Sequence, residues 1–443
     1  MGEELGARSG ISLPGDLVAH IHSFMSMRDA ARAACVSHAF LRSWRFYPKL
    51  NLNMETFDDL HALFDSDPSE VIDDDQIRRR GGEDYFRKNN RVVKGFIARV
   101  DHIMRNHAGT GITKFRVQPP LGFYIDPAAV DRWSAAIMEQ PGIKDFELEL
   151  APVYDDELYS FPCSLLLSAT TIASLTLSGC SFRSLDSLAG SSLTSLTRVH
   201  LHNMRVGTEE VRRFLSSCPA LEDLILSCCH QMVCFEMPPR LLPRLKSLLV
   251  YSCSTLLTIR CDAPKLQSFQ YVGPPTIQIS SLLAGATRSS SSCVRGMKIK
   301  SIDQPGMLCY AATKLQLPTI APNLIALSLS SCFETADTPM VIGKFCHLMY
   351  LDIHIREASR CPDYDFCSLV SLLDASPSLD TFILKLEMPD PRSDSIAIPP
   401  AAPDSSSQEK GSNSRHVATA GGPSSSQSED GAHQRVLLCK RHD

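Results

Sequence analysis

Hydrophobic positions in this chain recur in one short pattern, Pro-x-Leu-x-x-Leu-x-apolar, along most of its length. Six copies begin with a proline-containing pair: QPGIKDFEL at 140, CPALEDLIL at 218, LPRLKSLLV at 242, APKLQSFQY at 263, APNLIALSL at 321 and SPSLDTFIL at 376. Five weaker copies end at Val117, Leu177, Leu201, Ile299 and Ile353. Apolar residues at alternate positions are typical of a strand with one buried face, so each copy predicts a short strand.

The eleven predicted strands follow one another at intervals of 21 to 31 residues, the range of leucine-rich repeats. Burying three or four apolar side chains stabilises one repeat by roughly 5 to 10 kcal/mol. Ordering the ~25 residues of that repeat costs more, at about 1 to 2 kcal/mol for each residue. A single repeat is therefore unstable, and neighbouring repeats must stack. The sequence predicts an α/β solenoid with a curved parallel sheet and convex helices or loops.

The intervals between strands predict helical crossovers. Thr208 can cap a helix that Pro219 ends, with an apolar face of Val211, Phe214 and Leu215. Asp126 and Pro127 open a second helix, with a stripe of Val130, Trp133 and Ile137. An earlier stripe of Phe96, Val100, Ile103 and His107 predicts a helix that Gly109 ends.

The cysteines are interpreted as reduced thiols, because 16 of them occur in a chain without a signal peptide pattern. Four of them, Cys180, Cys229, Cys253 and Cys332, lie three residues after a predicted strand end, where such repeats bury a side chain in the turn. Cys228, Cys229, His230 and Cys234 could be zinc ligands, but a tetrahedral site usually draws on paired knuckles, and no second pair is near. We expect buried thiols there, and neither metal nor cofactor.

The N-terminal segment, residues 11–50, predicts three short helices. Their apolar positions are Leu13, Leu17, Ile21 and Phe24 in the first, Met27, Ala31 and Ala34 in the second, and Val36, Phe40 and Trp44 in the third. Three helices in about 40 residues cannot bury much area. We therefore expect the surface of a partner to complete this module.

The same segment resembles the F-box. Leu13, Pro14, Asp16 and Leu17 match its Leu-Pro-x-Asp-Leu opening, Ile21, Arg28 and Asp29 match its middle, and Val36 and Ser37 match its Val-Ser end. It departs from the pattern at Met25 and Ser26, where the F-box has Leu-Pro, at His38, which replaces an arginine, and at Phe40, which replaces a tryptophan.

Two further segments extend the resemblance to the plant F-box/leucine-rich-repeat family, over residues 11–388: RVVKGFIARVDHIMRNHAGTGITKF at 91 and YSFPCSLLLSATTIASLTLSGCSF at 159. The resemblance implies the substrate-recognition subunit of an SCF-type ubiquitin ligase, which is not itself an enzyme. Its F-box would bind a Skp-type adaptor, and through it a cullin and a RING subunit, while the repeats bind an unknown target protein. The adaptor-binding residues that it implies are Leu13, Pro14, Leu17, Ile21 and Val36.

Two alternatives stay open. The chain could be a leucine-rich-repeat scaffold that binds proteins outside any ligase, or a co-receptor for a small molecule, as in the hormone-receptor F-box proteins. Those receptors have a basic pocket floor, and no comparable cluster is found here. Many relatives also carry an α/β module after the repeats, which has no counterpart in this sequence, so a truncated isoform is a further interpretation.

These patterns divide the chain into five parts. We expect a disordered N-terminus at 1–10, the F-box at 11–50, a helical linker with an acidic and basic loop at 51–110, the repeats at 111–388 and a disordered tail at 389–443. The tail is rich in Ser, Pro, Ala and Gly and has no apolar period over most of its length. The loop contains IRRRGG at 77, which we interpret as solvated charge, with nuclear import as the alternative.

Composition narrows the class of protein further. Lys and Arg number 44 and Asp and Glu 49, so the net charge of −5 excludes a globally basic nucleic-acid binder. No apolar run reaches the ~18 residues of a membrane span. A P-loop, H-E-x-x-H, C-x-x-C and G-x-S-x-G are all missing from the sequence. We expect a non-catalytic protein in the cytoplasm, the nucleus or both.

The inner face of the predicted sheet is the candidate surface for the target. In each strand the two residues that flank the last apolar position point away from the core. Among them, Leu249, Tyr251 and Val272 are expected to anchor a target, while Lys298 and Lys300 select an acidic flank. His200 and His202 share this face and are interpreted as surface histidines. The alternative is that targets bind loops at the rim.

Overall fold

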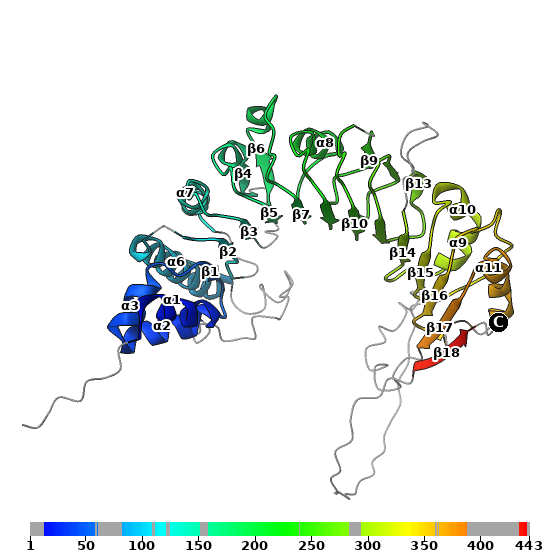
Figure 1. Ribbon diagram of the computed structural model, residues 1–443, viewed down its shortest axis with the longest axis horizontal. Coiled ribbons are helices and arrows are strands. Elements are labelled where there is room, and N and C mark those ends of the chain that lie inside the picture. Colours follow the sequence, from blue (N-terminus) through cyan, green and yellow to red (C-terminus); the bar gives the residue numbers. More distant parts are fainter. Residues whose placement is uncertain are drawn as a thin grey trace, which may run out of the picture.

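The chain folds as an arch in which a long curved sheet lines the inner side and helices and short strands cover the outer side (Figure 1). In the computed structural model, the described residues are 13–57, 60, 82–108, 111–120, 125–150, 158–238, 240–282, 294–358, 361 and 363–387, with the backbone of 434–440. The side chains of 82–90 and 281 lie outside the described residues. The predicted α/β solenoid is confirmed.

The inner sheet has thirteen strands, which run in chain order and are parallel apart from the last. They are β1 (Lys49–Leu52), β2 (Lys114–Val117), β3 (Asp145–Glu149), β5 (Ser174–Ser178), β7 (Arg198–His202), β8 (Asp223–Ser227), β10 (Ser247–Tyr251), β12 (Ser268–Val272), β14 (Gly296–Lys300), β15 (Ala326–Ser331), β16 (Tyr350–Ile355), β17 (Thr381–Glu387) and β18 (Gln434–Lys440). All eleven predicted strands are present. Their last apolar residues lie side by side, as Leu201, Leu226, Val250 and Tyr271 do.

Two strands of the inner sheet were not predicted. β1 pairs with β2 and buries Leu50 and Leu52, so the sheet begins inside the segment that connects the N-terminal helices to the repeats. β18 pairs antiparallel with β17, so the expectation of disorder throughout 389–443 is wrong at 434–440. The outer edge of β17 offers unpaired backbone groups, and the sequence RVLLC has the β-propensity to add to it. Residues 1–10, the loop at 77 and 388–433 lie outside the described residues.

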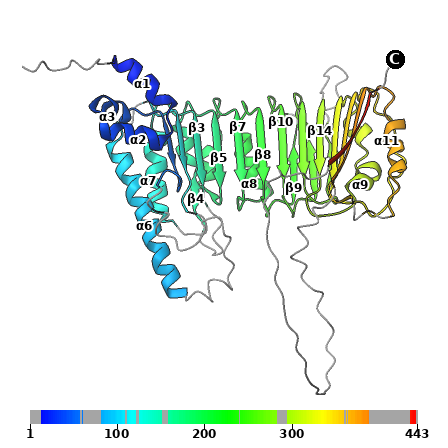
Figure 2. The same cartoon turned by 90° about the horizontal axis from the view of Figure 1, so that it is seen from below.

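The outer layer mixes helices with strands. Its elements are α6 (Gly82–Asn106), α7 (Pro127–Met138), α8 (Thr208–Ser216), α9 (Met307–Thr313), α10 (Leu317–Ile320), α11 (Val370–Asp374), the 3-10 helices η1 (Cys163–Leu167), η2 (Leu185–Leu188) and η4 (Phe366–Leu369), the pair β4 (Ser160–Pro162) and β6 (Ser181–Arg183), and a three-stranded sheet of β9 (Cys234–Met237), β11 (Thr258–Cys261) and β13 (Gln278–Ser281). The prediction of helical crossovers is wrong for the crossovers that contain β9, β11 and β13, which pair with one another in a second parallel sheet. Figure 2 looks onto the inner sheet, with the outer elements behind it.

The two helices predicted from their caps are present. In α7, the Asp126 carboxylate accepts a hydrogen bond from the Ala128 amide, and the predicted stripe of Val130, Trp133 and Ile137 is buried. Helix α8 begins at Thr208 as predicted but is capped differently. The Glu210 carboxylate accepts from the Gly207 amide at 2.8 Å, while the Thr208 hydroxyl donates to the Cys234 carbonyl.

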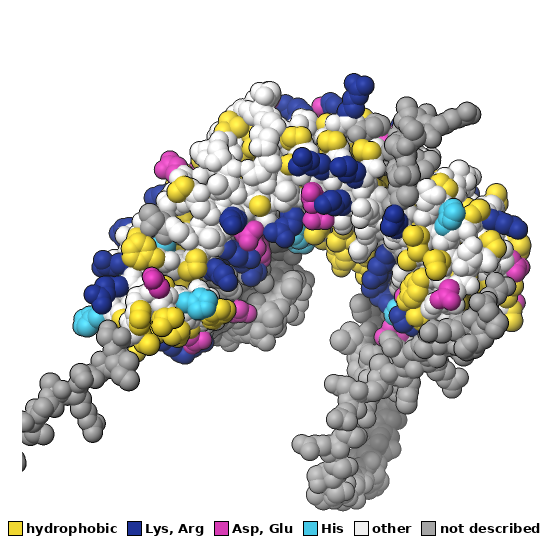
Figure 3. All heavy atoms as spheres, in the orientation of Figure 1, with side chains coloured by type: hydrophobic (Ala, Val, Ile, Leu, Met, Phe, Trp, Pro, Cys, Tyr) yellow, Lys and Arg dark blue, Asp and Glu magenta, His cyan; other side chains and the backbone are white. Residues whose placement is uncertain are grey.

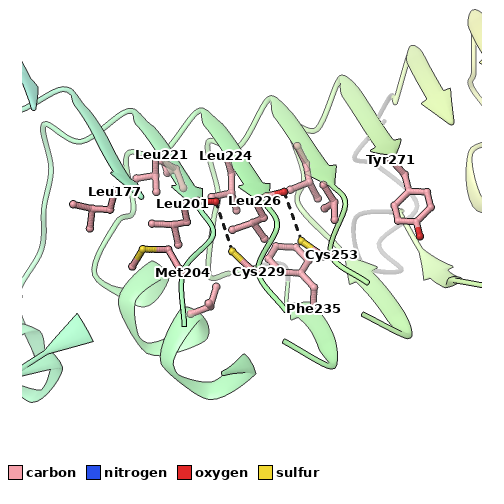
Figure 4. Packing of buried hydrophobic residues seen from close by; sticks show 14 of the residues in the cluster. Leu177, Leu201, Met204, Leu221, Leu224, Leu226, Cys229, Phe235, Cys253 and Tyr271 are labelled. Atoms are coloured by element: carbon pink, nitrogen blue, oxygen red, sulfur yellow. Dashed lines mark hydrogen bonds between the residues drawn. The ribbon is translucent and has the colours of Figure 1, made fainter. Parts of the chain in front are cut away.

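The turn cysteines are buried as predicted (Figure 4). The Cys229 thiol donates to the Leu201 carbonyl at 3.6 Å, and the Cys253 thiol donates to the Leu226 carbonyl at 3.8 Å, so each thiol joins its turn to the preceding repeat. Burial raises the pKa of the Cys180 thiol well above its usual range, and it raises the pKa of Cys261 to about 12. Such thiols stay protonated and are poor nucleophiles.

Candidate functional site

The N-terminal helices form one compact unit, which we call the helical module. It consists of α1 (Gly15–Phe24), α2 (Met27–Val36) and α3 (His38–Trp44). At the start of α2, the Ser26 hydroxyl accepts a hydrogen bond from the Asp29 amide at 3.1 Å. The structure thus confirms the three predicted helices.

His22 lies at the centre of the helical module and is only 1% exposed. Its Nδ1 is 2.9 Å from the Ser43 hydroxyl in α3, and its Nε2 is 2.9 Å from the Ala30 carbonyl in α2. One tautomer satisfies both contacts: Nε2–H donates to the carbonyl while Nδ1 accepts from the hydroxyl. One imidazole therefore joins all three helices, a role that the apolar pattern of the sequence does not reveal.

The outer side of the helical module is apolar and uncovered. The exposed hydrophobic side chains include Leu13, Leu17, Ile21, Phe24 and Val36, and Figure 3 shows hydrophobic atoms gathered at this end of the arch. Phe24 and Val36 are the most exposed, at 77% and 86%. Pro14 is exposed too, so every residue expected to bind an adaptor is accessible. Adjoining exposed apolar side chains are typical of a protein-interaction site.

A pocket of about 650 Å³ opens beside this apolar side, between the start of α1 and the end of α3. Leu13 and Pro14 line it from just before α1, Val18 lines it from α1, and Phe46 and Tyr47 line it from the segment after α3. Of those five exposed hydrophobic side chains, only Leu13 borders the pocket, so the pocket lies next to the apolar side and not within it.

The helical module is joined closely to the repeats. The Tyr47 hydroxyl donates to the Met25 carbonyl at 2.7 Å, and Nε2 of His107, after helix α6, lies 2.9 Å from the Tyr47 carbonyl. The Ala108 amide donates to the Arg45 carbonyl at 2.8 Å. Together with the pairing of β1 and β2, these bonds hold the module in one orientation relative to the sheet.

The first part of the inner face carries charges that neutralise one another. Lys114 lies 2.6 Å from Glu147, and Arg116 lies 2.9 Å from Glu149. In the next strands, His200 and His202 both contact the Ser227 hydroxyl at 2.9 Å. Burial lowers the pKa of both imidazoles, so they are neutral near pH 7. The two histidines are thus half-buried parts of the sheet surface.

The middle of the inner face holds the residues expected to bind the target. Tyr251 is 40% exposed and Leu249 is half-buried, but Val272 is only 7% exposed, so the expectation that Val272 is an open anchor is wrong. In register it lies between Tyr251 and Lys300, two long side chains that flank it. Lys298 is exposed, and neither it nor Lys300 forms an ion pair with any residue that the structure describes.

An apolar group that sequence reasoning missed lies at the start of strands β15 and β16. It comprises Ile325, Met349 and Tyr350, all of them exposed. The Met349 and Tyr350 amides both donate to the Ile325 carbonyl, which places the three residues side by side. Tyr350 lies on the inner face, since it occupies the alternate position before Asp352.

No helix among the described residues is long and apolar enough to cross a membrane. The same part of the chain contains no group of three or more His, Cys, Asp or Glu placed to hold a metal ion.

Comparison with known proteins agrees with this architecture. The family model described as At1g61320/AtMIF1, LRR domain, matches residues 103–421, which is well over half of the chain. F-box/LRR-repeat protein At3g59190 of Arabidopsis thaliana is 25% identical over 225 residues, half of this chain and half of its own. Putative F-box protein At3g58860 of the same plant is 24% identical over 214 residues, 48% of this chain and 40% of its own.

A longer match, over 357 residues, is to F-box/LRR-repeat protein At3g58930 of Arabidopsis thaliana. It is 23% identical and covers 76% of this chain and 68% of that protein. In the shorter matches, the chain spans half or less of the length of those relatives. The solenoid, the helical module and these matches together show that the chain belongs to the plant F-box/leucine-rich-repeat family.

Proposed function

We propose that this chain is the substrate-recognition subunit of an SCF-type ubiquitin ligase. The helical module acts as its F-box and binds a Skp-type adaptor, which connects it to a cullin and a RING subunit. The repeats hold the target protein. The chain supplies no catalytic group, and it acts by raising the local concentration of target lysines near a ubiquitin-conjugating enzyme.

The observation that carries this proposal is the uncovered apolar side of the helical module. Five large hydrophobic side chains lie there, three on α1, one at the end of α2 and one just before α1, although the same chain buries hydrophobic side chains throughout the repeats. Fully burying one such side chain is worth about 1.5 to 3 kcal/mol, so a partner that covers this side gains a large stabilisation. The names of the relatives, F-box and F-box/LRR-repeat proteins, favour the same role.

The bonds between the helical module and the repeats support a positioning role. A target on the inner face and an adaptor on the module would be held at a constant separation, because Tyr47, His107 and strand β1 fix the connection between them. Constant separation is what proximity catalysis requires of a non-catalytic subunit.

The test is co-purification of a Skp-type adaptor with the full chain. Leu17→Ala together with Ile21→Ala removes exposed side chains from α1, so the fold should be retained and adaptor affinity should fall about a hundredfold or more, as for central contacts of an interface. The matched control is Val233→Ala together with Leu257→Ala, which removes two exposed side chains from the repeats and should not change adaptor binding.

Undiminished adaptor binding by the double variant of α1 would contradict the assignment of the helical module. Failure of the unchanged chain to bind any Skp-type adaptor would favour the second function, a leucine-rich-repeat scaffold that acts outside a ligase. That alternative draws on the departures from the F-box pattern at Met25, Ser26 and His38.

A further inference from the structure

Strand β14 is the one place on the inner face, among the residues that the structure describes, where two adjacent basic side chains have no acidic neighbour. Lys298 and Lys300 alternate along the strand and so lie on the same face. The strands on either side, β12 and β15, have the sequences SFQYV and ALSLSS, which contain no charge. Arg295, exposed just before β14, adds a third positive charge.

Several other cations on or beside the inner face are paired. Described examples are Lys114 with Glu147, Arg116 with Glu149, Arg198 with Asp145, Lys246 with Glu222 and Lys385 with Asp352. Against this background, the two lysines of β14 form a local positive site on a chain whose net charge is −5. An unneutralised cationic strand is complementary to a ligand with acidic groups.

Apolar side chains lie on both sides of this positive site. Tyr251 on β10, with Leu249 beside it, lies two strands before β14, and Tyr350 on β16, with Met349 beside it, lies two strands after it. Figure 3 shows basic side chains on the inner side of the arch, with hydrophobic side chains to either side of them.

The register places these groups on a diagonal. Tyr251 is level with Lys300, and Tyr350 is level with Gly296 at the other end of β14, so Lys298 lies near the middle of the line that joins the two tyrosines. Four strand spacings of about 4.8 Å and four residues along a strand at about 3.3 Å give a line of roughly 23 Å. An extended peptide of about seven residues has that length.

We infer that the repeats recognise a short extended segment of the target, about seven residues long, with acidic residues at its centre and an apolar residue near each end. The acidic residues contact Lys298 and Lys300, and the apolar residues pack on Tyr251 at one end and on Tyr350 at the other. This inference deepens the proposed function by naming the class of target, and it rests on that function only for what happens to the target after it binds.

The experiment selects ligands from a library of random heptapeptides displayed on phage, with the immobilised full chain as bait. We expect the enriched peptides to carry Asp or Glu at the centre, with aliphatic or aromatic residues towards both ends. Individual selected peptides are then synthesised, and their affinity is measured by fluorescence anisotropy at low and high salt. Since exposed charges are screened by salt, the affinity should fall as the ionic strength rises.

Charge reversal is the decisive variant. Lys298→Glu together with Lys300→Glu should weaken the selected acidic peptides at least tenfold and should shift a new selection towards Lys and Arg at the centre. Lys314→Glu together with Lys344→Glu makes the same change of net charge at two exposed lysines away from β14, and it should leave both results unchanged. Lys298→Met with Lys300→Met keeps most of the side-chain volume and should remove the acidic preference without reversing it.

Three outcomes would overturn the inference. The enriched peptides could lack acidic residues, the control variant could weaken them as much as the β14 variant does, or a peptide of glutamates alone could bind as tightly as one with apolar ends. Adaptor co-purification is measured on the same preparations. Retained adaptor binding with no acidic preference contradicts this inference alone, and lost adaptor binding by unchanged chain contradicts only the proposed ligase role.

Discussion

The helical module and the repeats differ in the exposure of their hydrophobic residues. In the repeats, the last apolar residue of each inner strand is buried, from Val117 at one end to Leu384 at the other. In the helical module, Leu13, Leu17 and Val36 belong to the apolar pattern of their helices and are nevertheless exposed. The same kind of side chain therefore forms the core in one region and an uncovered surface in the other.

The two regions differ in whether the chain itself supplies a surface that covers their apolar side. Every repeat has a neighbour that covers its apolar side, and stacking therefore satisfies the sequence within the chain. The three short helices pack on the start of the sheet through Met27 and Ala30 but leave their other side open, and His22 joins all three. An apolar pattern predicts burial only where the chain itself supplies the covering surface, and elsewhere it predicts a partner.

The strongest test of this difference is to truncate one leucine in each region. Leu226 is fully buried between repeats, so Leu226→Ala should lower the free energy of unfolding by about 2 to 5 kcal/mol. Leu17→Ala removes a half-exposed side chain and should change it by about 0.5 kcal/mol or less. Denaturant unfolding followed by circular dichroism measures both, and equal losses of stability would show that the module has a core of its own.

A second, smaller effect is expected from removing the central imidazole. His22→Ala leaves the Ala30 carbonyl and the Ser43 hydroxyl without their buried partner, which should destabilise the helical module by about 2 to 4 kcal/mol. Hydrogen exchange should quicken at the amides of α1 to α3 and stay slow in the strands of the repeats. His20→Ala, at an exposed position of the same helix, is the matched control and should leave the exchange of all three helices unchanged.

Much of the fold could be predicted from the sequence, because the apolar motif recurs once for each repeat that has to stack on the next. Copies of one apolar motif, six of them led by a proline, predicted all eleven repeat strands, since each copy must present the same face to stack. Strand β1 was missed because KLNL carries only two apolar residues, although Pro48 precedes it. Strands β9, β11 and β13 were missed because they pair with one another across successive repeats, a contact that exists only in the stacked solenoid.

The residues of the candidate sites, too, could be predicted from the sequence only in part. The exposed residues of the helical module could be predicted, because too many apolar positions fell in too short a segment. Tyr350 was missed because the predicted inner face included only the two residues next to each last apolar position, while Tyr350 lies two residues earlier on the same face. The burial of Val272 depends on its neighbours in register, and strand register is a property of the folded sheet.

The smallest expected effect is a pH dependence in the first part of the inner face. Burial lowers the pKa of His200, with a further contribution from the neighbouring His202, while Glu149 and Glu147 oppose the shift. The pKa of His202 is lowered by burial as well. Both imidazoles are therefore neutral in the folded chain at a pH where the unfolded chain, with a pKa of about 6.5, begins to bind protons. Because the unfolded state binds more protons, the free energy of unfolding should fall as the pH drops from about 7.5 through 6.5.

His200→Gln together with His202→Gln should make the unfolding midpoint less sensitive to pH over that interval, while His347→Gln, at an exposed histidine, should leave the slope as it is. Thermal unfolding at a series of pH values measures the slope, and an unchanged slope in the double variant would show that these two histidines do not contribute to the acid sensitivity.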